Sequence, residues 1–124
     1  MGYESKLYIV EKSTVKNNDG MAYARVIAMF DMCKFSVLSH MLRDEPKATC
    51  YFYADDGDTE VLEDKYGCPL TETTVRNVIN VLETTVANGE DYRRIFPLLS
   101  TLKVIDEQQK NGRWGEIVVL HYGY

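Results

Sequence analysis

Hydrophobic and polar residues alternate over the first part of the chain, which is the pattern of a half-buried β-strand. The alternation covers residues 3–11, and a second strand-like run covers residues 23–30. Between them lies Asn17-Asn18-Asp19-Gly20, whose residue types tolerate the positive φ angles of a turn. The pattern therefore predicts two antiparallel strands that are joined through this loop.

A short helix is expected after the second strand, followed by a β-hairpin. Asp31 can cap a helix that runs to Leu42, and Pro46 ends it. Residues 48–65 then alternate around Asp55-Asp56-Gly57-Asp58, and an Asp-Gly pair between two strand-like runs is a strong hairpin signal.

The register of this hairpin depends on the length of its loop. A two-residue Asp56-Gly57 loop would set three facing pairs: Phe52 with Val61, Tyr51 with Leu62, and Tyr53 with Glu60. The same register would place Asp55 opposite Asp58, where like charges repel. Either the loop is longer than two residues or this repulsion is tolerated.

The second half of the chain has the pattern of two amphipathic helices and a last strand. Apolar side chains recur at helical spacing in residues 71–88, before Gly89, and again in residues 91–109. Their predicted core residues are Val75, Val78, Ile79, Leu82 and Val86, then Ile95, Leu98, Leu99, Leu102 and Ile105. Pro97 should kink the second helix or mark its true start, and residues 114–122 form the last strand.

Most of the strands precede the two long helices, which favours an α+β fold over a doubly wound parallel sheet. We expect an antiparallel sheet of about five strands, with the two longer helices packed on one face. At 124 residues the chain is expected to form one domain, residues 1–124. The longest apolar stretch, residues 26–30, is much shorter than the ~20 residues that cross a bilayer, so no membrane contact is expected.

The cysteine content and the N-terminus bear on the compartment. Cys33, Cys50 and Cys68 are odd in number and far apart, which favours reduced thiols. The N-terminus is charged and strand-like and has no pattern of a signal peptide. A cytoplasmic location follows as the expectation.

Charge singles out one segment of the chain. Residues 44–72 hold nine acidic and two basic residues, a net charge of −7, whereas the rest carries +2 and the whole chain −5. A concentrated charge projects a local field that selects partners of opposite sign. The acidic balance also argues against direct nucleic-acid binding, which needs clustered Lys and Arg.

The acidic hairpin is therefore the candidate partner-binding site. Tyrosines lie among its acids, and tyrosine is a preferred contact residue because it offers apolar area and a hydroxyl together. The predicted contact residues are Tyr51, Tyr53, Asp55, Asp56, Asp58, Glu60, Glu63 and Asp64. The alternative interpretation is that these charges only keep the surface soluble.

No motif specifies a reaction. The chain lacks the glycine-rich phosphate loops and the G-x-S-x-G sequence of serine hydrolases. The run from Asp56 to Glu60 resembles the start of a calcium loop, but Gly67 stands where the twelfth-position acid belongs, so a turn is favoured. His40, His121 and the cysteines lack ligand spacing, and we expect neither a metal nor a cofactor.

Both ends of the chain resemble those of small uncharacterised proteins from bacteriophages and prophages of Gram-positive bacteria. The resemblance is carried by residues 1–10 (MGYESKLYIV) and residues 118–124 (VVLHYGY). It implies a phage accessory protein, a class that includes inhibitors of host defence. Some of these inhibitors are acidic and occupy the nucleic-acid channels of host nucleases.

Three functions remain open from the sequence. The first is a non-enzymatic protein whose acidic hairpin docks on a basic partner surface, such as that of a nucleic-acid-binding host protein. The second is a small enzyme or ligand-binding domain with a site formed by His121, Cys50, Asp31 and Tyr122. The third is a structural phage component or homo-oligomer with a patch formed by Tyr3, Trp114, Tyr122 and Tyr124.

Overall fold

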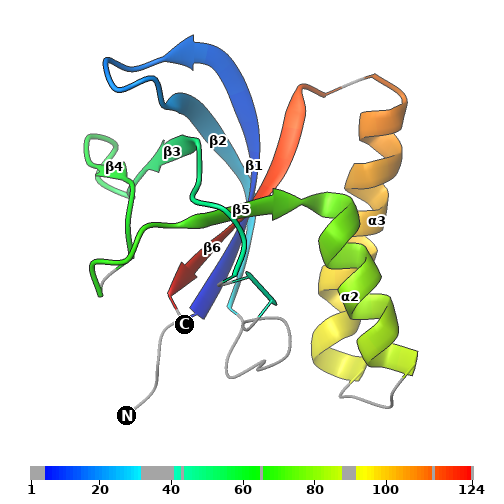
Figure 1. Ribbon diagram of the computed structural model, residues 1–124. Helices are drawn as coiled ribbons and strands as arrows, with labels where there is room; N and C mark the ends of the chain where they lie inside the picture. The colour runs from blue at the N-terminus through cyan, green and yellow to red at the C-terminus, as the bar shows by residue number, and fades with distance from the viewer. Residues whose placement is uncertain are drawn as a thin grey trace.

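The computed structural model describes residues 5–31, 41–42, 44–64, 66–87, 92–112 and 114–123, with backbone alone for residues 85–87 and 92–95. Its elements, shown in Figure 1, are β1 (Ser5–Lys16), β2 (Ala22–Asp31), β3 (Cys50–Tyr53), β4 (Glu60–Val61), β5 (Thr71–Thr74), α2 (Val75–Ala87), α3 (Tyr92–Lys110) and β6 (Glu116–Gly123). One six-stranded sheet has the order β4-β3-β2-β1-β6-β5, with the helices beside it. The predicted α+β class is confirmed.

The predicted hairpin of two long strands is confirmed in β1 and β2, which pair antiparallel. The side chain of Asn17 holds their connection, because its Oδ1 accepts the backbone N–H groups of Asp19 and Met21, each at 2.9 Å. Gly20 has a φ of 78°, which a residue with a side chain rarely adopts. The turn is therefore fixed by the residue types that predicted it.

The sheet departs from the expected one in two respects. β2 and β3 pair in parallel, at Ala22 with Cys50 and at Tyr23 with Tyr51, so the sheet is mixed. A parallel pair needs a connection of a dozen residues or more, and the 18 residues from 32 to 49 are long enough. A sixth strand, β5, pairs antiparallel with β6 where the first turn of a helix was expected.

The helix after β5 begins at Val75 rather than near residue 71. Its start is set by Thr74, whose Oγ1 accepts the backbone N–H of Asn77 at 3.1 Å and caps the first turn. The preceding threonines are β-branched and pair with β6 instead. α3 begins at Tyr92 and continues through Pro97, so Pro97 does not mark its start. The helix expected over residues 31–42 falls largely outside the described residues.

The capping role of Thr74 leads to a first prediction. Thr74→Ala should lower the free energy of unfolding by about 1 kcal/mol, because the N–H of Asn77 loses its acceptor. Urea denaturation of both proteins measures this difference. Thr84→Ala is the control, since Thr84 is exposed within α2 and its hydroxyl donates to the Asn80 carbonyl of the same helix. An equal loss in both variants would contradict the capping role.

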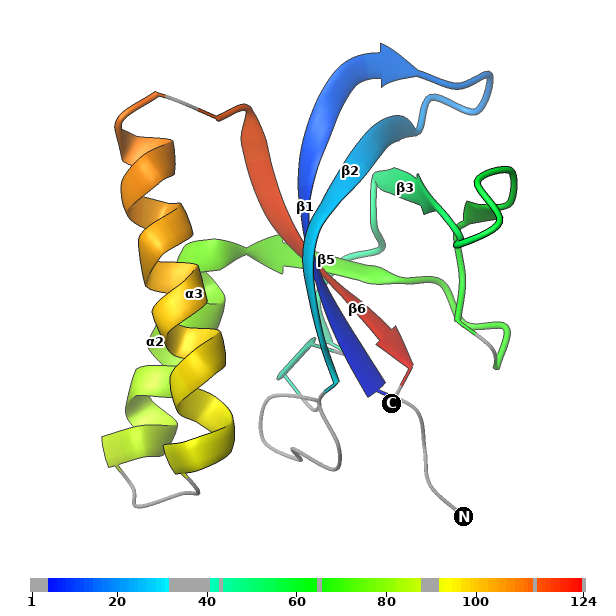
Figure 2. The same cartoon turned by 180° about the vertical axis from the view of Figure 1, so that it is seen from behind.

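The helices cover one face of the sheet, as predicted. Figures 1 and 2 show α2 and α3 side by side on the same side of the central strands. Leu7 and Ile9 of β1 and Ile117 and Val119 of β6 point toward them, in alternation with residues of the other face. The two helices contribute eight residues to this core, all of them buried and all of them predicted: Val75, Val78, Ile79, Leu82, Leu98, Leu99, Leu102 and Ile105. The side chains of Val86 and Ile95 lie outside the description.

A second core fills the opposite face, because the sheet curls back on itself. The chain before β3 meets β5 at a bridge between Lys47 and Thr71, and Ala48 N donates to Leu70 O at 2.9 Å. Within this curl lie the other side chains of the central strands, together with residues of β3 and the residue before β5: Val10, Ala22, Ala24, Cys50, Phe52, Leu70, Val118 and Leu120. The first half of β1 and most of β6 are therefore buried or half-buried on both faces.

Candidate functional site

The acidic hairpin, residues 49–64, lies at one edge of the sheet, where β3 and β4 are the last two strands. Phe52 pairs with Val61 and Tyr53 with Glu60, so the register predicted for these two pairs is confirmed. The loop is longer than two residues, because Ala54 N donates to Thr59 O at 2.8 Å and closes residues 55–58 into one turn. Within it, Gly57 N donates to Ala54 O at 2.9 Å and Gly57 has a φ of 77°. Asp55 and Asp58 are therefore not a facing strand pair.

Asp56 holds the loop together. Its Oδ1 accepts the backbone N–H groups of Asp58 and Thr59, and its Oδ2 accepts the Thr59 hydroxyl at 2.6 Å. These bonds, that of the hydroxyl first, lower the pKa of Asp56 to about 2. The run from Asp56 to Glu60 is thus a hydrogen-bonded turn, and the side chain of Asp56 is engaged within it.

Asp64 has a comparable internal role after β4. Its side chain is buried, and its Oδ1 accepts the backbone N–H groups of Tyr66 and Cys68 at 2.8 and 3.0 Å. A buried carboxylate that is bonded within its own turn is poorly placed to meet another molecule. The structure therefore separates Asp64 from the other predicted contact residues.

The remaining hairpin acids are exposed. Asp55, Asp58, Glu60 and Glu63 all lie at the surface, and Glu60 Oε2 accepts one hydrogen bond, from Asn17 Nδ2 at 3.3 Å. Within the described part of the chain, none of the four forms an ion pair with a lysine or arginine. Their charges are therefore not neutralised by the bases that the structure describes.

A cluster of three tyrosines supports the hairpin. The ring centroids of Tyr23, Tyr51 and Tyr53 lie 5.6–6.0 Å apart, in tilted and edge-to-face contacts. Tyr51 is buried and Tyr53 is 41 % exposed, so only the second offers substantial area to another molecule. A hydrogen bond with Tyr53, then burial and the neighbouring charges, raise the pKa of Tyr51 to about 12.

Sequence reasoning missed a polar cluster inside the curl of the sheet. Lys12 Nζ donates to Glu72 Oε2 at 2.9 Å and to Thr49 Oγ1 at 2.6 Å. Glu72 Oε1 accepts the backbone N–H of Thr49 at 2.9 Å and lies 3.7 Å from Cys50 Sγ. The available signal was the period of β1, which places Lys12 on the same face as the buried Val10.

The two ion-paired residues of this cluster have shifted pKa values. Burial lowers the pKa of Lys12, but the hydrogen bond and charge of Glu72 outweigh it, so the net shift is upward. Burial likewise raises the pKa of Glu72, and the bonds from Thr49 N and Lys12 outweigh it, so the net shift is downward. Both directions favour the charged pair. The cluster joins β1, β5 and the start of β3, which is a structural role.

The residues of the alternative enzyme site do not form one cluster, because His121 and Cys50 lie on opposite faces of the sheet. Asp31 ends β2 opposite Lys6, which is also the strand partner of Tyr122. His121 shares the helix-facing side of β6 with Ile117 and Val119, and its Nε2 lies 2.9 Å from Ser5 Oγ. Cys50 belongs to the core on the opposite face, as does Tyr122 at its edge. Burial, with the charge of Glu72, raises the pKa of Cys50 to about 12, so its thiol stays protonated and is a weak nucleophile.

The residues of the alternative oligomer patch are also separated. Trp114 packs against the core beneath the helices, whereas Tyr122 packs against the core inside the curl. Tyr3 and Tyr124 lie outside the described residues. No patch that combines Trp114 with Tyr122 forms on one face.

Comparisons with known proteins assign neither a family nor an activity. No protein-family model, curated protein or solved structure matches the chain. Among the helices that the structure describes, none is both long and apolar enough to cross a bilayer. The geometry of the hairpin is therefore the main basis for assigning a function.

Proposed function

We propose that this chain is a non-enzymatic interaction protein whose acidic hairpin docks on a basic surface of another protein. The observation that carries the proposal is the exposure of Asp55, Asp58, Glu60 and Glu63 without an ion pair among the described residues. Carboxylates in this state keep their full attraction for an external cation, whereas an ion pair weakens that attraction.

The tyrosine cluster adds an apolar anchor beside these charges. The exposed ring of Tyr53 rests against Tyr23 and Tyr51, so its orientation is restricted before a partner arrives. A pre-ordered aromatic ring loses little conformational entropy on binding, and it attracts the guanidinium groups of a basic partner. Tyr53 is the contact through which a docked surface would gain affinity, and the acids are the groups that would guide it there.

The resemblance of the chain ends suggests the kind of partner. A phage-encoded acidic protein in the cytoplasm of a bacterial host would meet host defence proteins and nucleic-acid-processing proteins, whose basic channels hold polyanions. An acidic hairpin can occupy such a channel in place of nucleic acid and inhibit the protein. Direct binding of nucleic acid is not part of the proposal, because like charges repel.

The test compares two triple variants that remove equal charge. The hairpin triple, Asp55→Asn, Asp58→Asn and Glu63→Gln, changes exposed acids whose side chains make no hydrogen bond to the described residues. The control triple, Glu83→Gln, Glu107→Gln and Glu116→Gln, changes exposed acids elsewhere. Asp56 and Asp64 are left intact because they stabilise turns.

Each protein is immobilised at low salt, and captured proteins of the bacterial host are quantified by mass spectrometry. We expect a partner whose recovery falls about tenfold or more with the hairpin triple and stays unchanged with the control triple. Capture that is equal on all three proteins, or that falls equally with both triples, would refute the proposal. So would the absence of any saturable partner.

A further inference from the structure

Among the described strands, the outer edge of β2 is paired over only a short stretch. β1 pairs along the whole strand on one side, but β3 pairs on the other side only at Ala22 and Tyr23. From residue 24 to residue 30, no other described strand pairs with this edge. An open edge presents backbone donors and acceptors on which an additional strand can form.

The position of the open backbone groups follows from the period of the strand. Ala22 N donates outward to Thr49 O at 3.1 Å, so the backbone groups of Ala24 and Val26 point to the same edge. Ala24 is 1 % exposed, so the accessible part of this edge begins at Arg25 and Val26. Val26 is 38 % and Met29 48 % exposed, and both face away from the helices, as their partners Val10 and Tyr8 do. An added strand would therefore find apolar contacts on that face.

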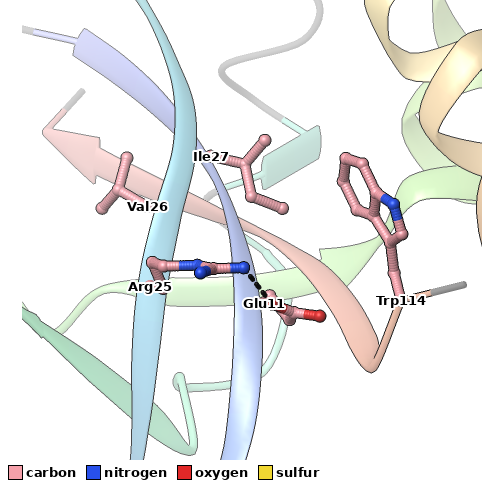
Figure 3. A pocket seen from close by; sticks show the side chains of 5 residues that line it. All are labelled: Glu11, Arg25, Val26, Ile27 and Trp114. Carbon is pink, nitrogen blue, oxygen red and sulfur yellow. Dashed lines mark hydrogen bonds and ion pairs between the residues drawn. The ribbon is translucent and has the colours of Figure 1, made fainter.

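A bulge and a hollow lie next to this edge. Ile27 and Ala28 together oppose Ile9, which is the arrangement of a β-bulge, a feature that is common beside functional sites. The adjacent hollow of about 370 Å³, shown in Figure 3, is lined by Glu11, Arg25, Val26, Ile27 and Trp114. In this view Ile27 and the Arg25 side chain project toward the space in front of the Trp114 ring.

Arg25 brings N–H donors to the hollow beyond the one that Glu11 binds. Glu11 uses both oxygens, since Oε1 accepts from Arg25 Nη2 and Oε2 accepts from Gly115 N, each at 2.8 Å. A guanidinium has several N–H donors, and the side chain of Arg25 is 72 % exposed. Arg25 can therefore bind a second acceptor, and a carboxylate is the acceptor that it binds best.

We infer that the open edge of β2 binds an extended segment of a partner protein, with an acidic side chain of that segment bound to Arg25 beside Trp114. Backbone pairing with the exposed part of the edge, from Val26 onward, supplies affinity, and the hollow selects the acidic residue, as in other cases of strand addition. This surface is separate from the acidic hairpin and prefers the opposite charge. The inference therefore stands whether or not the hairpin docks on a basic protein.

The experiment uses a defined peptide as the probe. It is acetylated and amidated, alternates valine with serine and carries one central glutamate. Titration into the ¹⁵N-labelled protein should give saturable amide shifts that are concentrated in residues 24–30 and the Trp114 indole. A glutamine-containing peptide should bind about fivefold more weakly, because it loses a charge-assisted hydrogen bond. A backbone N-methylated peptide should not bind, because it cannot pair with the edge.

Two variants identify the role of Arg25. Arg25→Gln should abolish the preference for glutamate over glutamine, whereas Lys103→Gln, on the exposed side of α3, should retain it. The inference is overturned if shifts map elsewhere or do not saturate, or if the N-methylated peptide binds equally. It is also overturned if the preference survives in Arg25→Gln, or if the protein self-associates through this edge.

Discussion

Val78→Asp is expected to unfold the protein. Val78 is completely buried in α2, within the core between the helices and the sheet. An unpaired carboxylate at this position cannot keep its hydration, and the cost of burying it is comparable to the whole net stability of about 5–15 kcal/mol. Circular dichroism during urea denaturation should show no cooperative transition for this variant.

The matched control for this variant lies two residues further along the same helix. Asn80 is exposed, so Asn80→Asp adds the same charge without burying it, and its unfolding free energy should stay within about 0.5 kcal/mol of the wild type. A soluble Val78→Asp protein that unfolds cooperatively near the wild-type midpoint would show that the core is misplaced.

Loss of Glu72 is expected to have the second-largest effect. Glu72→Gln should lower the free energy of unfolding by about 3 kcal/mol, because Lys12 would be left charged and largely buried without its counter-ion. Glu107→Gln removes an exposed carboxylate of α3 and should change stability by less than about 0.5 kcal/mol. Equal, small losses in both variants would contradict the structural role of the cluster.

The effect of Glu72→Gln should depend on pH in a defined direction. The pKa of Glu72 lies below its ordinary value of 4.5, so its contribution is present above pH 4.5 and is lost as the pH falls through the folded-state pKa. The pKa of Lys12 lies above 10.5, so its contribution is present below pH 10.5 and is lost as the pH rises through the folded-state pKa. The stability difference between wild type and Glu72→Gln should therefore shrink in acid. Urea denaturation of both proteins, from neutral to acidic pH, measures this stability difference.

The buried faces of the two helices were predictable from the sequence because they depend on local periodicity. Val78, Ile79 and Leu82 recur at helical spacing and are buried in the structure. The start of α2 was not predictable from this pattern, since Thr73 and Thr74 pair with Val119 and Val118 of a strand more than 40 positions away. The long-range pairing overrode the local helical pattern.

The curl of the sheet was likewise beyond local reasoning. The parallel pairing of β2 with β3 and the bridge between Lys47 and Thr71 are contacts between distant segments. They also bring Lys12 to Glu72, 60 positions apart, so the buried ion pair could not be predicted without the topology. Neither the burial of the Lys12 side chain nor its partner was predicted from the sequence.

The candidate site was predictable in its location rather than in the role of each residue. The Asp-Gly pair and the surrounding alternation indicated a hairpin that carries most of the negative charge, and the register of Phe52 with Val61 is confirmed. Which acids stabilise turns depends on backbone N–H groups that converge only after folding. Asp56 and Asp64 therefore could not be told apart from the exposed acids by sequence.

The most direct test of the central claim is the rate at which the captured partner associates with the protein as salt is varied. Stopped-flow measurements on the wild type, the hairpin triple and the control triple would determine it. At low salt the hairpin triple should associate about tenfold or more slowly than the other two, and the difference should nearly vanish at high salt. Association of the hairpin triple at the wild-type rate in low salt would contradict an electrostatic role for the hairpin.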